Sequence, residues 1–158
     1  MVLSRIAMLA AISCSAALFA ADQPANMGGT WKLNIERSKW GKRDKPTHGD
    51  IQIEQHDPSL KYKGSVLNAN GTDVRKFEFD GAIDGKSYPV SGPDGAGAIT
   101  VRRVNDTTIQ SHYTSNNGKV FEDATTSISK DGKELTRRVR RKDPHGEVTW
   151  TEVYDKVG

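Results

Sequence analysis

Four charged residues lie two positions away from apolar residues, in segments that otherwise alternate between apolar and polar side chains. Because successive side chains of an extended strand point to opposite faces, each charge is expected on the same face as its apolar neighbours. An isolated charge on a buried face costs several kcal/mol, whereas two opposite charges compensate one another. The pattern predicts polar positions inside an apolar interior, at Arg103, Glu122, Arg137 and Glu152.

Turn positions predict which of these charges meet. A two-residue turn at Asp131-Gly132, followed by a five-residue loop from Lys142 to Gly146 that leaves Glu147 unpaired, sets Arg137 directly opposite Glu152. The same register pairs Thr126 with Arg137, Ile128 with Leu135, Ala124 with Val139, Val139 with Trp150, and Leu135 with Tyr154. Apolar residues therefore meet apolar residues, which supports the register.

The resulting hypothesis is an interior pair of Arg137 and Glu152 close to three aromatic residues. Two interpretations remain open: an internal salt bridge or a charge at a water-exposed mouth, and a site that anchors a ligand. In the second case we expect the ligand-binding residues to be Arg137, Glu152, Tyr154, Trp150, Tyr113, Arg103 and Glu122.

Catalytic motifs have little support in the sequence. No serine stands in a Gly-x-Ser-x-Gly elbow, and the histidines lack the spacing of metal ligands, so we expect no catalytic residue, metal or cofactor. His112 is expected to face outward from its strand. The four histidines are His48, His56, His112 and His145.

The most basic segment, residues 137–142, invites a nucleic-acid or anionic-surface interpretation. Alternation places only Arg138 and Arg140 on the outer face, and nearby strands carry acidic residues. The formal charge of the whole chain is only +3. The favoured interpretation is therefore that the basic side chains of residues 137–142 lie on a solvent-exposed outer face, and we expect no nucleic-acid partner.

The elements that must position these residues are short and separated by clusters of Asn, Asp, Gly and Pro, with almost no helical periodicity. Any helix is confined to residues 36–40, and 41–50 resembles a polar loop. Ten strands with one apolar face must close on themselves to hide that face, which favours an antiparallel up-and-down β-barrel over a sandwich. The predicted strands are Thr30–Ile35, Ile51–His56, Leu60–Leu67, Val74–Phe79, Ser87–Val90, Ala98–Val104, Thr108–Thr114, Lys119–Ser129, Glu134–Arg141 and Glu147–Asp155.

The first residues have the pattern of a secretory signal. Arg5 precedes the uncharged run from Ile6 to Phe19, which is shorter than the ~20 residues that a membrane-spanning helix needs. Small residues at Ala20 and Ala21 favour cleavage there. Cys14 fits a lipid-attachment pattern only loosely, because the apolar run continues beyond it.

We therefore expect a signal peptide over residues 1–21 and a single domain over 22–158, exported to the periplasm or the extracellular space. Without Arg5 the domain has 22 basic and 20 acidic residues, since the chain has 23 and 20. It contains no cysteine, so it must fold without a disulfide. We expect a monomer without a membrane span.

Both ends of the predicted barrel resemble a known superfamily. Gly29-Thr30-Trp31 resembles the opening G-x-W signature of the lipocalins and fatty-acid-binding proteins, and residues 148–156 are similar to the last strand of the latter. Residues 84–90 resemble segments of secreted bacterial lipocalin-like proteins of unassigned function. The resemblance implies a barrel of the calycin type, closed at one end by the tryptophan, that holds a small apolar or amphipathic molecule.

One position departs from that superfamily. Its terminal strand carries Arg-x-Tyr, which binds the carboxylate of the ligand; Tyr154 matches the tyrosine, but Glu152 replaces the arginine. A carboxylate there repels another carboxylate. The sequence thus favours an exported carrier of a hydrophobic or amphipathic small molecule. The alternative is a structural or protein-interaction module of the cell envelope with a self-filled barrel, and an enzyme ranks third.

Overall fold

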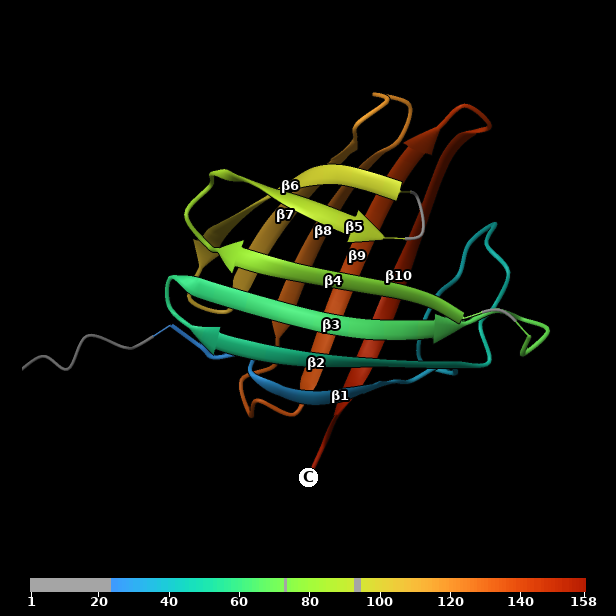
Figure 1. Cartoon of the computed structure of the whole chain (residues 1–158). Coiled ribbons are helices and arrows are strands. Elements are labelled where there is room, and N and C mark those ends of the chain that lie inside the picture. Colours follow the sequence, from blue (N-terminus) through green and yellow to red (C-terminus); the bar gives the residue numbers. More distant parts are fainter. Residues whose placement is uncertain (1–23, 73, 93–94) are drawn as a thin grey trace, which may run out of the picture.

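The computed structural model describes residues 24–72, 74–92 and 95–158. They form an all-β, closed, ten-stranded antiparallel barrel in which each strand pairs with its sequence neighbours and β1 with β10 (Figure 1). The predicted fold class is confirmed; the predicted signal peptide lies outside the described residues. The strands are β1 (Gly29–Leu33), β2 (His48–His56), β3 (Ser59–Leu67), β4 (Val74–Ala82), β5 (Ser87–Gly92), β6 (Gly95–Asn105), β7 (Thr108–Ser115), β8 (Phe121–Ile128), β9 (Glu134–Asp143) and β10 (Gly146–Val157).

The predicted register of the last three strands is confirmed. Arg137 of β9 lies opposite Thr126 of β8 and Glu152 of β10, and the predicted apolar pairs of these strands also form. One detail of the prediction is wrong, because Glu147 is paired with Lys142 and the β9–β10 turn is shorter than expected. The β9–β10 pairing continues for more residue pairs than predicted, but its register does not change, so each side chain keeps its face.

The first strand ends earlier, and the second begins earlier, than the sequence predicted. β1 stops at Leu33 because Asn34 starts a turn, in which its side chain accepts a hydrogen bond from the amide of Arg37 at 3.1 Å. β2 begins at His48, inside the predicted polar loop. No helix forms over 36–40, and within the described ranges there is no helix able to cross a membrane.

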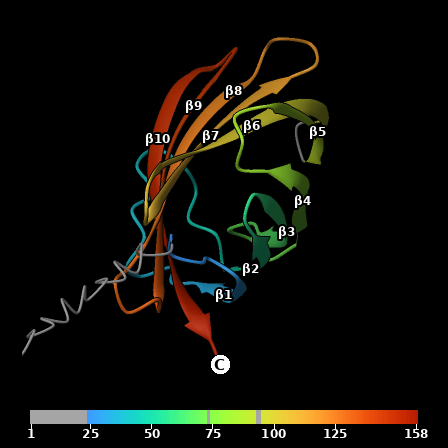
Figure 2. The ribbon, with the colours of Figure 1, turned by 90° about the vertical axis from the view of Figure 1, so that its left-hand side faces the viewer.

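β4 and β5 are an exception to the regular pairing of neighbours. Only one residue pair, Glu78 with Ser91, is in register between them. In the connection between them, the amide of Gly85 donates to the carbonyl of Val101 in β6. Figure 1 shows β1–β4 crossing the steeper β8–β10, and Figure 2 shows the two sets from the side.

The chain segment before β1 covers one end of the barrel, which we call the closed end. The amide of Ala25 donates to Asp106 in the β6–β7 turn, and that of Met27 donates to the side chain of Gln55 in β2 at 2.9 Å. Trp31 is completely buried beneath this segment, and its indole N–H donates to the carbonyl of Met27 at 2.9 Å. Most of the apolar core gathers around these residues.

Residues 34–47 connect β1 to β2 and lie against the edge of β10. Lys39 and Thr151 form an isolated antiparallel bridge. At Gly41 the backbone has φ of +59°, and a β-carbon there would lie 2.5 Å from the carbonyl oxygen of Thr149. Glycine is therefore needed both for the left-handed conformation and for the close approach.

We expect Gly41→Ala to lower the free energy of unfolding by more than the ~1–2 kcal/mol of an unfavourable φ, because the close contact adds to it. Gly132→Ala is the matched control, since Gly132 has φ of +70° and nothing within 4 Å of its β-carbon position. Urea unfolding of both variants measures the difference. Equal losses would contradict the close contact.

Candidate functional site

Arg137 lies between two carboxylates in the interior of the barrel. Its Nη1 donates to Oε2 of Glu152 at 3.1 Å, and its Nη2 donates to Oε1 of Glu122 at 2.5 Å. The three residues come from β10, β9 and β8, and their side chains are 9%, 26% and 19% exposed for Glu152, Arg137 and Glu122. The predicted pairing of Arg137 with Glu152 is present, with Glu122 as a second partner.

Two aromatic residues complete the surroundings of Glu152. The indole N–H of Trp150 donates to Oε1 at 2.7 Å, and the hydroxyl of Tyr154 donates to Oε2 at 3.1 Å. Alternation along β10 places all three side chains on the inner face. We call the five residues Glu122, Arg137, Trp150, Glu152 and Tyr154 the polar centre.

Electrostatics keep Arg137 charged and Tyr154 protonated. Burial alone would lower the pKa of Arg137, but the neighbouring carboxylates of Glu152 and Glu122 raise it above its ordinary value. Burial, together with the charge of Glu152, raises the pKa of the Tyr154 hydroxyl well above its ordinary value. Tyr154 therefore remains a hydrogen-bond donor to Glu152 throughout the neutral range.

Alkaline titration tests this arrangement. Burial raises the pKa of Tyr62 to about 12, and that of Tyr154 also lies above the usual 10. Both phenols lose protons more easily when the chain is unfolded. Their contribution to stability is thus complete below pH 10 and is lost as the pH rises toward 12. We expect the ultraviolet absorbance of phenolate to rise in steps above pH 10 that Tyr62→Phe and Tyr154→Phe each remove. A single step near pH 10 would contradict the raised pKa values.

Two of the predicted ligand-binding residues lie outside the polar centre. Tyr113 lies opposite Glu122 in the β7–β8 register and packs against the apolar core. Arg103 is three strands away from Arg137 along the sheet, and its Nη2 donates to Asp57 in the β2–β3 turn at 2.5 Å. Asp57 also accepts a hydrogen bond from Gln55, so Arg103 belongs to the closed end.

The sequence prediction missed Arg43, which lies in the connection between β1 and β2. Its guanidinium carbon is 4.0 Å from the centroid of the Trp150 ring, close enough for a cation–π contact. Its electrostatic neighbours include Glu152, Arg75, Glu122 and Arg141. No periodic pattern marks a loop residue, so only the folded chain reveals this position.

The end of the barrel opposite the closed end is less covered. Several inward-facing residues near the β7–β8 and β9–β10 turns are only partly buried, whereas Met27 and Trp31 at the closed end are almost fully buried. We call this the open end. The partly buried residues there include Tyr113, Glu122, Arg141 and Val148.

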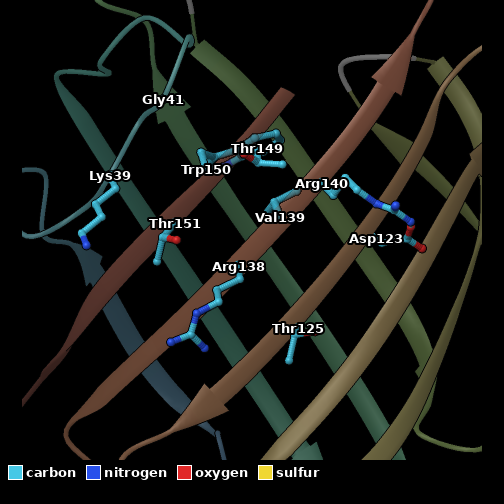
Figure 3. Close-up of a pocket in the computed structure, with 10 residues that line it drawn as sticks. All are labelled: Lys39, Gly41, Asp123, Thr125, Arg138, Val139, Arg140, Thr149, Trp150 and Thr151. Atoms are coloured by element: carbon cyan, nitrogen blue, oxygen red, sulfur yellow. The ribbon is translucent and has the colours of Figure 1, made fainter. Parts of the chain in front are cut away.

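The outer wall carries an open pocket of about 530 Å³ between residues 39–41 and β8–β10, and Trp150 of the polar centre is among its lining residues. Figure 3 shows Lys39, Thr151, Arg138 and Thr125 in a row across it. Arg138 and Arg140 lie on this face, as predicted. Asp123 accepts hydrogen bonds from Arg140, at 2.7 Å, and is also 2.7 Å from Nδ1 of His112, which is half-exposed on the same wall.

No known protein family matches the sequence of the chain, and no curated protein is significantly similar to it.

Proposed function

We propose that this protein is an exported carrier or binding module that holds a hydrophobic or amphipathic small molecule inside its barrel. The observation that carries the proposal is the difference between the two ends. Trp31 is 0% exposed at the closed end, whereas several inward side chains at the open end, among them Glu122 and Val148, are only partly buried. A barrel with one open end is a common architecture for a small-ligand site.

The polar centre supports the same proposal. It places charged and hydrogen-bonding groups beside apolar and aromatic side chains, which is the composition of sites that orient small ligands. The position of Trp31 at the closed end agrees with the role that the G-x-W signature implies. We therefore propose a relationship to the lipocalin and fatty-acid-binding-protein superfamily, with a monomer as the working form.

A second candidate is a structural or interaction module with a self-filled barrel. Its specific support is a group of packed aromatic rings on the inner face of β3–β5. Tyr62 is stacked on Phe79 with ring centroids 5.1 Å apart, and Phe79 meets the edge of Tyr88 at 6.0 Å. These rings occupy interior volume that a ligand would otherwise use.

Titration with the uncharged dye Nile red distinguishes the two candidates. A carrier is expected to give saturable one-to-one binding, and native mass spectrometry of protein isolated from its source should detect a bound small molecule. Val148→Trp, on the inner face near the open end, should weaken binding, whereas Glu147→Trp on the outer face should not. If the dye shows no saturable binding and no bound molecule is found, the self-filled module is favoured.

A further inference from the structure

Arg43 is the one guanidinium at the open end whose hydrogen-bonding capacity is unused by the described residues. The side chain is partly buried, and its guanidinium forms no hydrogen bond or ion pair with the part of the chain that the structure describes; only the backbone amide of Arg43 is bonded, to the carbonyl of Trp40. A guanidinium has five N–H donors, and leaving such donors unpaired away from water is unfavourable. Its contact with the face of Trp150 leaves the edge of the guanidinium available to another group.

The carboxylates around Arg43 are already used by other residues. Both oxygens of Glu152 accept hydrogen bonds within the polar centre, and Glu122 accepts one from Arg137. Asp143 lies 3.6 Å from Arg141. The carboxylates of Glu152 and Glu122 are therefore engaged by other donors, and the guanidinium of Arg43 is available to an external anion.

The loop holds Arg43 in place without help from a ligand. The Lys39–Thr151 bridge and the close contact of Gly41 with Thr149 fix the chain just before it. Trp40 packs against both groups of buried apolar residues. A positioned guanidinium loses little freedom on binding, and its planar edge matches the two oxygens of a carboxylate or phosphate.

We propose that Arg43 binds the anionic group of an amphipathic ligand, a carboxylate or a phosphate monoester, while the apolar part of the ligand enters the barrel. This inference rests on the proposed function and names the ligand class. The anchor is a loop residue stacked on Trp150. It is not the terminal-strand pair that the superfamily resemblance implies, where Glu152 stands in place of the arginine.

Displacement of Nile red by three twelve-carbon compounds, all below their micelle concentrations, tests the proposal. Dodecanoate and dodecyl phosphate are expected to bind about 10- to 100-fold more tightly than dodecanol, the range for a charge-assisted hydrogen-bonded pair. Arg43→Gln should remove this preference, so that both anions bind no more tightly than dodecanol. Comparing dodecanoate with dodecyl phosphate identifies which anionic group the site favours.

Arg140→Gln is the matched control, because it removes the same charge from the outer wall and should not change the preference. Arg43→Lys keeps the charge but not the planar edge, so it should retain part of the preference. Equal binding of dodecanol and both anions to the unaltered protein overturns the role of Arg43 while the carrier function stands. If the dye does not bind and native mass spectrometry finds no bound molecule, the carrier function fails.

Discussion

Arg137→Met is expected to lower the free energy of unfolding by about 3–5 kcal/mol, the range for removing one member of a buried ion pair. The loss arises because Glu122 and Glu152 would both be left in the interior without the guanidinium that binds them. Urea unfolding followed by tryptophan fluorescence measures it. Arg140→Met, on the same strand but on the outer face, should lose less than about 1 kcal/mol, because its partner Asp123 is exposed.

Removing the carboxylate charges should reverse most of this loss. We expect the triple variant Arg137→Met, Glu122→Gln, Glu152→Gln to be more stable than Arg137→Met alone. Glutamine at position 152 retains an oxygen that can accept the hydrogen bonds of Trp150 and Tyr154. A triple variant as unstable as the single one would mean that lost packing, and not unpaired charge, accounts for the effect.

Trp31→Ala is expected to lower the free energy of unfolding by about 3–5 kcal/mol, as for other large aromatic residues removed from a core. Trp31 is fully buried, and the ammonium group of Lys156 lies 5.2 Å from its ring centroid. Trp31→Phe separates the two contributions: it keeps an aromatic ring but leaves the carbonyl of Met27 without its donor, for about 1–3 kcal/mol. Thermal and urea unfolding should rank the variants in that order.

If Trp31→Ala lowered the free energy of unfolding by less than about 1 kcal/mol, the position of the segment before β1 would not depend on the indole of Trp31. In that case the closed end would be held mainly by Gln55, which accepts the amide of Met27 and donates to Asp57. Gln55→Ala would then be the more damaging change.

The sequence predicts which face of its strand each side chain takes, but it does not predict which side chains of distant strands and turns meet in the closed barrel. Period-two alternation assigns a residue to the inside or the outside, and short turns fix the local register. This was enough to pair Arg137 with Glu152. It does not determine how the closed barrel brings distant turns together, which is why Arg103 meets Asp57 and not the polar centre.

Loop residues were beyond the reach of the same reasoning. Arg43 has no apolar neighbours at regular spacing, and its place over Trp150 depends on the path of residues 34–47 along β10. The sequence also failed to predict the start of β2, because local propensity does not reflect tertiary contacts. Gly49 and Asp50 have low strand propensity, yet β1 lies alongside, and a β-carbon at Gly49 would lie 2.8 Å from Leu33.

Residues 25–27 carry a practical consequence for handling the protein. They are hydrogen-bonded to β2 and to the β6–β7 turn, so they are as much a part of the folded domain as any strand. Affinity tags and fusion partners are best joined upstream of Pro24, with a flexible spacer. Proteolytic trimming that removes Met27 would remove the hydrogen bonds that hold the closed end of the barrel.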